Sequence, residues 1–158
     1  IGKALTGGFI SLAATIASKK IFNAFLSNKK NMEFMHGPTY MANPLACSAA
    51  NASLDLFENR NYANIVIEIE KSLNNQLKKF TSFKFVKEVR VKGAIGVIEL
   101  FSLTEKDITW LRKNFIKNGV WLRPLGNIVY FTPPLLISKK DLNYLTQTTY
   151  QIFKTWKK

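Results

Sequence analysis

The spacing of apolar residues predicts a long amphipathic helix in the middle of the chain, followed by two strands. Between residues 62 and 80, apolar side chains recur every three or four positions, which is the period of a helix with one buried face. They are Tyr62, Ile65, Val66, Ile69, Leu73, Leu77 and Phe80. Residues 84–91 and 94–100 predict two strands joined around Lys92-Gly93, because both are rich in β-branched and aromatic residues.

Capping signals predict two further helices. The segment Thr104-Glu105-Lys106-Asp107 resembles a capping box in which Asp replaces the usual Glu, and Gly119 is a suitable C-terminal stop. Ser138 is expected to cap the last helix. The elements expected between these helices are short strands at 120–122 and 128–131, with a turn at 124–127. This order of elements predicts an α+β domain.

The first part of the chain has a different pattern. Residues 4–18 are the most apolar stretch and predict a buried strand followed by a turn. The stretch is too short and too interrupted for a membrane span, and it lacks the basic start and cleavage site of a signal peptide. A helix is expected from Pro44, after an Asn43 cap. Its inward face is expected to be Ala46, Ala49, Ala50, Ser53, Leu54 and Phe57.

The polar stretch 58–61 is the expected domain boundary. It separates residues 1–60 from the α+β domain, residues 61–158. The formal net charge of +13 invites a nucleic-acid interpretation. However, the basic residues are nearly all scattered lysines, without an arginine-rich stripe or an RNA-binding signature. We therefore expect neither a nucleic-acid nor a membrane partner.

Cysteine and histidine are too few for a disulfide or a metal centre. The single cysteine, Cys47, cannot form an internal disulfide, so a reducing compartment and a cytoplasmic location are expected. Cys47 and the single histidine, His36, do not make a metal-ligand cluster. Both are expected to serve in packing.

Three segments carry candidate chemistry. Lys3 lies in a glycine-flanked apolar stretch, where loss of hydration favours the neutral amine, a nucleophile toward carbonyl groups. Thr39 follows Gly37-Pro38 just before a helix, and its hydroxyl with nearby backbone N–H groups can hold a phosphate. Arg123 can bind a carboxylate through two parallel hydrogen bonds, and Tyr130 lies seven residues beyond it.

Taken singly, each of these residues also fits an ordinary role. Lys3 could be a loop lysine, Thr39 a turn hydroxyl, Arg123 an ion-pair partner in a sheet, and Tyr130 a core residue. Together, an amine, a phosphate site and a carboxylate contact are what pyridoxal-phosphate chemistry on an amino-acid-like substrate requires.

The order of these segments resembles that of the class III aminotransferases. The matching stretches are Gly2–Gly8, His36–Cys47 and Gly119–Gly126, and the similarity runs over essentially the whole chain. Residues 93–97 (Gly-Ala-Ile-Gly-Val) and the tyrosine before Phe-Thr-Pro-Pro favour the branch of this family that acts in biotin biosynthesis. The resemblance implies the C-terminal part of an α/β, fold-type I transferase. Residues 1–60 would be the tail of its large cofactor domain, and residues 61–158 its small α+β domain.

The resemblance also implies a role for each candidate residue. Lys3 corresponds to the lysine that binds pyridoxal 5'-phosphate covalently and moves a proton between substrate and cofactor. Pro38-Thr39 corresponds to the cofactor phosphate contact, which this family makes across a homodimer interface. Gly37 and Tyr130 correspond to substrate contacts. Arg123 corresponds to the residue that binds the carboxylate of 8-amino-7-oxononanoate, which receives an amino group from S-adenosylmethionine and becomes 7,8-diaminononanoate.

Other parts of the family pattern are missing. Asp55 lies within a helix pattern, and Asp107 and Asp141 lie in first turns, where they favour the helix dipole, so none is expected to face the cofactor ring nitrogen. The chain, which begins without Met, is therefore expected to be the C-terminal portion of a longer enzyme and inactive alone. Two alternatives remain open. One is another class III aminotransferase, of the ornithine or acetylornithine type. The other is a non-enzymatic remnant of a split gene, or a module that only binds a partner.

Overall fold

The computed structural model describes residues 1–156 and divides the chain into two compact units. The first comprises Ile1–Asn61 and the second begins at Tyr62. The division lies one residue beyond the boundary expected from the polar stretch at 58–61. Each unit has its own internal packing, so each is described by itself.

The second unit contains a four-stranded antiparallel sheet in the order β1-β2-β4-β3. Its strands are β1 (Val86–Lys92), β2 (Ile95–Leu100), β3 (Arg123–Leu125) and β4 (Ile128–Phe131). Strands β1 and β3 are the edges, and β1 carries a bulge between Val86 and Glu88. The strand expected at 120–122 is wrong: the strand begins three residues later, at Arg123. Pro124, which was expected in the turn, lies within β3. A proline is tolerated there since an edge strand does not need its missing N–H.

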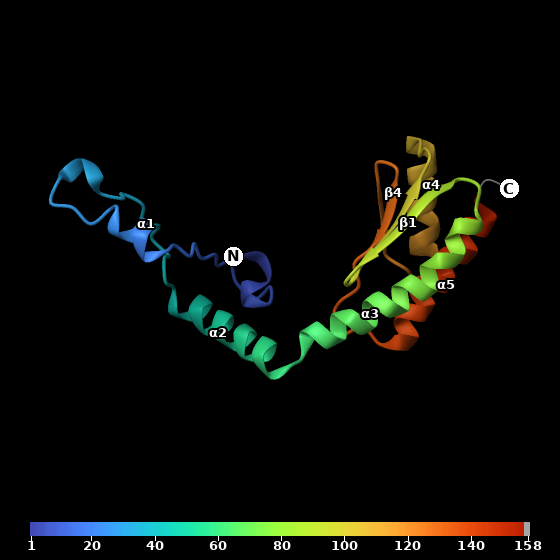
Figure 1. Ribbon diagram of the computed structural model, residues 1–158. Coiled ribbons are helices and arrows are strands. Elements are labelled where there is room, and N and C mark those ends of the chain that lie inside the picture. Colours follow the sequence, from blue (N-terminus) through green and yellow to red (C-terminus); the bar gives the residue numbers. More distant parts are fainter. Residues whose placement is uncertain (157–158) are drawn as a thin grey trace. The chain divides into compact units, whose positions relative to one another are not determined.

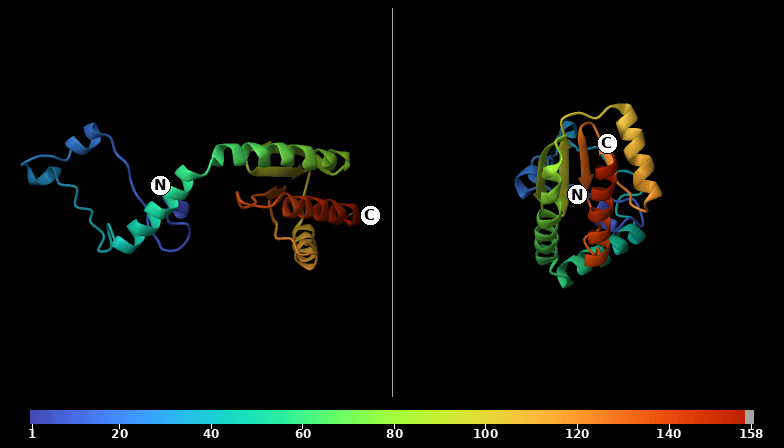
Figure 2. Two further views of the ribbon diagram at one scale, coloured as in Figure 1. Left: turned by 90° about the horizontal axis from the view of Figure 1, so that it is seen from below. Right: turned by 90° about the vertical axis from the view of Figure 1, so that its right-hand side faces the viewer.

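Three helices cover one face of this sheet (Figure 1 and Figure 2). They are α3 (Tyr62–Leu77), α4 (Glu105–Lys117) and α5 (Lys139–Thr155), and the 3-10 helix η3 (Lys78–Ser82) extends α3. The predicted capping box is confirmed: Asp107 N donates to Thr104 Oγ1 at 3.2 Å, and Thr104 N donates to the Asp107 carboxylate at 3.0 Å. Ser138 caps α5 as expected.

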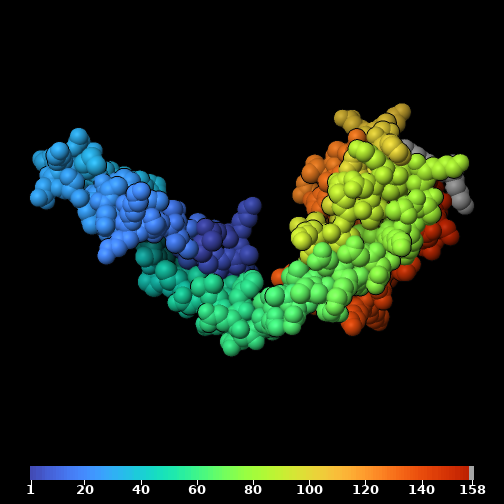
Figure 3. Space-filling model, in the orientation of Figure 1, coloured from blue at the N-terminus to red at the C-terminus, as the bar shows by residue number. Residues whose placement is uncertain are grey.

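Large side chains fill the space between the sheet and these helices. Phe80, Phe115, Phe131 and Phe153 are fully buried, and Phe80 packs edge-on against Phe153 with ring centroids 5.3 Å apart. In the space-filling view the elements of this unit are closely packed (Figure 3). Such burial of apolar surface is the main stabilising contribution to a domain of this size.

Helix α3 approaches β2 very closely at Gly96. A Cβ atom on residue 96 would lie 2.6 Å from Leu77 Cδ1 and 3.7 Å from Leu73 Cδ1. Carbon atoms in contact prefer a separation of about 3.5–4.0 Å, so a side chain at this position would require the fully buried Leu77 side chain to move.

The first unit contains the 3-10 helix η1 (Lys3–Thr6), the short helix α1 (Lys19–Asn23), the 3-10 helix η2 (Lys30–Met32) and α2 (Pro44–Asn59). The buried strand expected within residues 4–18 is wrong. After η1 this stretch is irregular and mostly exposed, and Phe9 is 90% exposed. An apolar stretch forms a strand only where a neighbouring strand satisfies the hydrogen bonds of its backbone N–H and C=O groups. Among residues 1–156 this stretch has no such neighbour.

Helix α2 begins as predicted, with the Asn43 side chain accepting hydrogen bonds from Leu45 N and Ala46 N. Its small residues face η1, and Ser53 Oγ donates to Ala4 O at 3.4 Å. Leu54 and Phe57 were expected on the inward face but are about half exposed. Within residues 1–156, none of the helices is both long and apolar enough to span a membrane.

We predict that Gly96→Ala lowers the free energy of unfolding of the second unit by about 1–3 kcal/mol, because the new methyl group overpacks the contact with Leu77. Urea unfolding followed by tryptophan fluorescence measures this change. Leu77→Val removes the atom that would clash, so Gly96→Ala should cost less in that background. An equal cost in both backgrounds would show that the contact does not matter.

Candidate functional site

Lys3 is the first residue of η1 and has an unusual backbone conformation. Its φ is 51°, in the left-handed region that residues other than glycine rarely adopt. The turn is closed by a hydrogen bond from Leu5 N to Gly2 O of 3.2 Å and another from Gly7 N to Ala4 O of 3.0 Å. Such strained residues cluster at functional sites, so the conformation supports a role for Lys3 beyond solvation.

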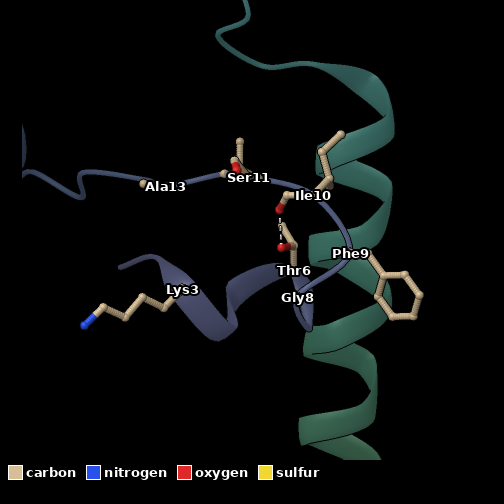
Figure 4. A pocket seen from close by; sticks show the side chains of 8 residues that line it. Lys3, Thr6, Gly8, Phe9, Ile10, Ser11 and Ala13 are labelled. Carbon is tan, nitrogen blue, oxygen red and sulfur yellow. Dashed lines mark hydrogen bonds between the residues drawn. The ribbon is translucent and has the colours of Figure 1, made fainter.

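Lys3 borders an open cavity of about 560 Å³. The other lining residues come from the adjoining loop and are Thr6, Gly8, Phe9, Ile10, Ser11, Leu12 and Ala13. Thr6 is buried, and its hydroxyl donates a hydrogen bond to Ile10 O, which folds the loop back over η1 (Figure 4). The Lys3 side chain extends away from Thr6 (Figure 4). Its amine has no hydrogen-bond or ion-pair partner within residues 1–156, and is therefore available to a ligand.

The predicted phosphate contact lies elsewhere in the first unit. Gly37, Pro38 and Thr39 are exposed, and a hydrogen bond of 2.9 Å from Met41 N to Pro38 O closes the turn that contains Thr39. None of the three lines the Lys3 cavity. This unit therefore does not bring Thr39 to Lys3.

Arg123 and Tyr130 are brought together in the second unit. They are directly paired on β3 and β4, and side chains of such a pair lie on the same face of a sheet. Both line a cavity of about 300 Å³. Its other lining residues are mostly apolar: Trp121, Leu122, Thr132, Pro133, Pro134, Ile137 and Leu145. A guanidinium beside an apolar cavity suits a ligand with a carboxylate and an aliphatic chain.

A second arginine on the same sheet is already paired. Arg123, Tyr130, Val97 and Arg90 form one cross-strand row of the sheet. Arg90 Nη1 donates to Glu88 Oε2 at 2.6 Å and also to Glu99. These hydrogen bonds, the one to Glu99 first, raise the pKa of the Arg90 guanidinium. Arg123 has no carboxylate partner within residues 1–156, so of the two arginines it is the one available to an anion.

Sequence reasoning missed Trp121 as a site residue. It is 74% exposed and lines the cavity beside Arg123. Its signal was the two-residue spacing from Arg123, which places both side chains on one side of an extended segment. The packing role expected for His36 differs from the structure, in which His36 is exposed and its ring contacts that of Phe34, with centroids 5.6 Å apart. Cys47 is partly buried, which is compatible with the packing role expected for it. Among residues 1–156, no group of three or more His, Cys, Asp or Glu side chains could hold a metal ion.

Comparisons with a family profile, with curated proteins and with solved structures all match this chain to aminotransferases. The family profile described as Aminotransferase class-III matches residues 1–153. The adenosylmethionine-8-amino-7-oxononanoate aminotransferase of Buchnera aphidicola subsp. Schizaphis graminum is 46% identical over 145 residues, which cover 92% of this chain and 33% of that protein. The crystal structure of the Methanocaldococcus jannaschii protein of the same name superposes with a TM-score of 0.84 and 34% identity, covering 98% of this chain and 37% of that one.

A further solved structure is the PLP-bound amine transaminase from an uncultivated Pseudomonas species. It superposes with a TM-score of 0.85 and 26% identity over 98% of this chain and 37% of that one. These structures confirm the predicted fold class, part of an α/β fold-type I transferase. The chain spans about a third of the length of the relatives that it matches.

The ion pairs around Arg90 generate a pH prediction. Hydrogen bonds from Lys87 and Arg90 hold the pKa of the Glu99 carboxyl below its usual range. This contribution to stability is present above the pKa of Glu99 in the unfolded chain and is lost as the pH falls through the lower folded value. We predict that Lys87→Gln raises the pKa of Glu99 in the folded protein, because one of its two hydrogen-bonded cations is lost. NMR titration of the Glu99 carboxyl carbon measures this pKa. The control is Lys92→Gln, which removes a positive charge from the same strand that forms no ion pair among residues 1–156. Equal shifts in both variants would contradict a specific pair.

Proposed function

The chain belongs to the class III aminotransferase family, and we propose that it is the C-terminal part of an enzyme that transfers the amino group of S-adenosylmethionine to 8-amino-7-oxononanoate. The product would be 7,8-diaminononanoate, in biotin biosynthesis. The observation that carries the proposal is that Arg123, which has no carboxylate partner among residues 1–156, lies beside Tyr130 at a mostly apolar cavity. The ketone substrate has the two features that this cavity suits, a carboxylate and an aliphatic chain.

The first unit fits the cofactor of this family, pyridoxal 5'-phosphate. Lys3, in a strained turn at the edge of a cavity, offers a primary amine that has no partner in the part of the chain that the structure describes. A primary amine is the group that binds an aldehyde cofactor. When bound, the cofactor supplies an electron sink for the substrate carbanion. Lys3 Nζ would hold the cofactor, and once released would carry the proton that leaves the substrate carbon.

The exposed Pro38-Thr39 turn fits a contact between subunits. In a homodimer, the Thr39 hydroxyl and nearby backbone N–H groups would bind the cofactor phosphate of the partner subunit. Its separation from the Lys3 cavity within one chain is compatible with this arrangement. Gly37, in the same turn, would contact substrate. The cysteine content suits the reducing cytoplasm, where we propose that the enzyme acts.

Arg123 would fix one end of the ketone substrate. Its guanidinium would donate two parallel hydrogen bonds to the carboxylate, while Tyr130 and the apolar wall of the cavity would cover the chain and exclude water. This contact would place the ketone carbon for reaction without taking part in the proton transfer. Arg123 is therefore a binding residue and Lys3 a catalytic one.

A second class III activity has some structural support. The acetylornithine aminotransferase of Elizabethkingia anophelis superposes with a TM-score of 0.83 and 25% identity over 98% of this chain. An assay of amino donors separates the two activities, since only the proposed enzyme would take S-adenosylmethionine in preference to acetylornithine.

In the complete enzyme, we predict that Lys3→Ala lowers the transamination rate by at least about a thousandfold, since the amine that binds the cofactor and moves the proton is lost. Borohydride reduction followed by peptide mass spectrometry provides an independent readout: the cofactor mass on the peptide that contains residue 3 should disappear. Lys20→Ala, an exposed lysine of the same unit, should leave that mass in place. If Lys3→Ala kept full activity and carried the cofactor mass on another lysine, the assignment of Lys3 would be wrong.

We also predict that Arg123→Ala, in the complete enzyme, lowers kcat/KM for 8-amino-7-oxononanoate by about tenfold to a hundredfold, because a charge-assisted double hydrogen bond is lost. Covalent attachment of the cofactor should be unchanged. Separate assays of the ketone half-reaction and of cofactor attachment measure the two effects. Equal losses in both would argue for a general structural defect rather than a carboxylate contact.

A further inference from the structure

A second cavity adjoins Arg123, at the free edge of β3. It has a volume of about 260 Å³ and is lined by Arg112, Ile116, Trp121, Leu122 and Arg123. Trp121 and Arg123 also line the larger cavity that contains Tyr130. Two arginine side chains, one from α4 and one from β3, therefore border the same small space.

The structure holds Arg112 at this edge. Its Nη2 donates to Pro124 O at 3.5 Å, a long hydrogen bond to the middle residue of the edge strand. An arginine has several N–H groups in a fixed planar arrangement, so this single contact leaves others available. The contact orients Arg112 beside β3 without neutralising its charge.

Neither arginine is balanced by an acid. Within residues 1–156, Arg112 and Arg123 form no ion pair with a carboxylate, whereas Arg90 on the same sheet pairs with two. An anion bound in this cavity would be attracted by both positive charges. The walls of the cavity, Ile116 and the exposed Trp121, are apolar. The site therefore combines excess positive charge with a surface for an aliphatic chain.

We propose that Arg112 and Arg123 form one carboxylate site, in which Arg123 makes the direct contact and Arg112 supplies a second positive charge from the edge of β3. This inference rests on the proposed function, since the carboxylate is that of the ketone substrate, and it adds a residue that the family motif does not include. Arg112 acts through its charge, so a lysine at this position should serve nearly as well, whereas a neutral residue should not.

The test uses the 158-residue chain and hexanoate as the probe, with hexanamide as its uncharged counterpart. Binding is followed by the NMR signals of the arginine side chains and of the Trp121 indole during titration. We expect Arg112→Gln to weaken hexanoate binding by about three- to tenfold, the size of a partly screened charge interaction. Arg112→Lys should restore most of the affinity, and added salt should reduce the difference between the variants. Lys113→Gln, next along α4 and outside both cavities, removes the same charge and is the matched control.

The outcomes separate this inference from the proposed function. If Arg112→Gln binds hexanoate as Lys113→Gln does, while Arg123→Gln loses binding, the two-arginine site is wrong and the carboxylate contact of Arg123 stands. If Arg123→Gln binds as well as the unaltered chain, or if hexanamide binds as well as hexanoate, the carboxylate contact itself fails, and this inference fails with it. Unchanged backbone NMR spectra in each variant show that the fold is intact.

Discussion

The depth at which α3 lies against the sheet depends on the absence of a side chain at residue 96. Leu77 Cδ1 occupies the space that a Cβ atom would need, so a larger residue would require the buried Leu77 side chain to rearrange. Helix α5 packs against α3, and α4 packs against both α5 and β3, so this contact lies within the packing of the whole helical layer. That layer covers one face of the sheet, and its helix α5 contributes Leu145 to the cavity that Arg123 and Tyr130 also line.

Ion pairing distinguishes the two arginines of this sheet. Arg90 and Arg123 lie in the same cross-strand row, but among residues 1–156 Arg90 pairs with two glutamates and Arg123 with no carboxylate. A charge that is already paired must break that ion pair before it can bind a new partner, and breaking the pair costs free energy. A guanidinium without an ion-pair partner can bind an anion directly. The same sheet thus holds one arginine in surface ion pairs, while the guanidinium of the other is available to an anion.

The sequence predicted most of the second unit because its signals are local. The helical spacing between residues 62 and 80, the Thr104 capping box and the Ser138 cap each act within a few residues, and each has the structure expected. Prediction was wrong where the outcome depends on distant partners. Pro124 is acceptable within β3 only because that strand is an edge, and the apolar stretch at 4–18 has no strand beside it. Likewise, the motif indicated Arg123, but its pairing with Tyr130 comes from the register of β3 and β4, which no local pattern specifies.

The bulged edge strand β1 has a consequence for how the molecule behaves in a crowded solution. Its outer backbone groups are unpaired by any neighbouring strand of this sheet, and such an edge can recruit a strand from another molecule. The exposed charges of Lys87, Glu88, Arg90 and Lys92, together with the irregularity after Val86, make that recruitment unfavourable. The charged residues that pair with Arg90 on the surface of the sheet thus also make edge-to-edge association of this strand unfavourable.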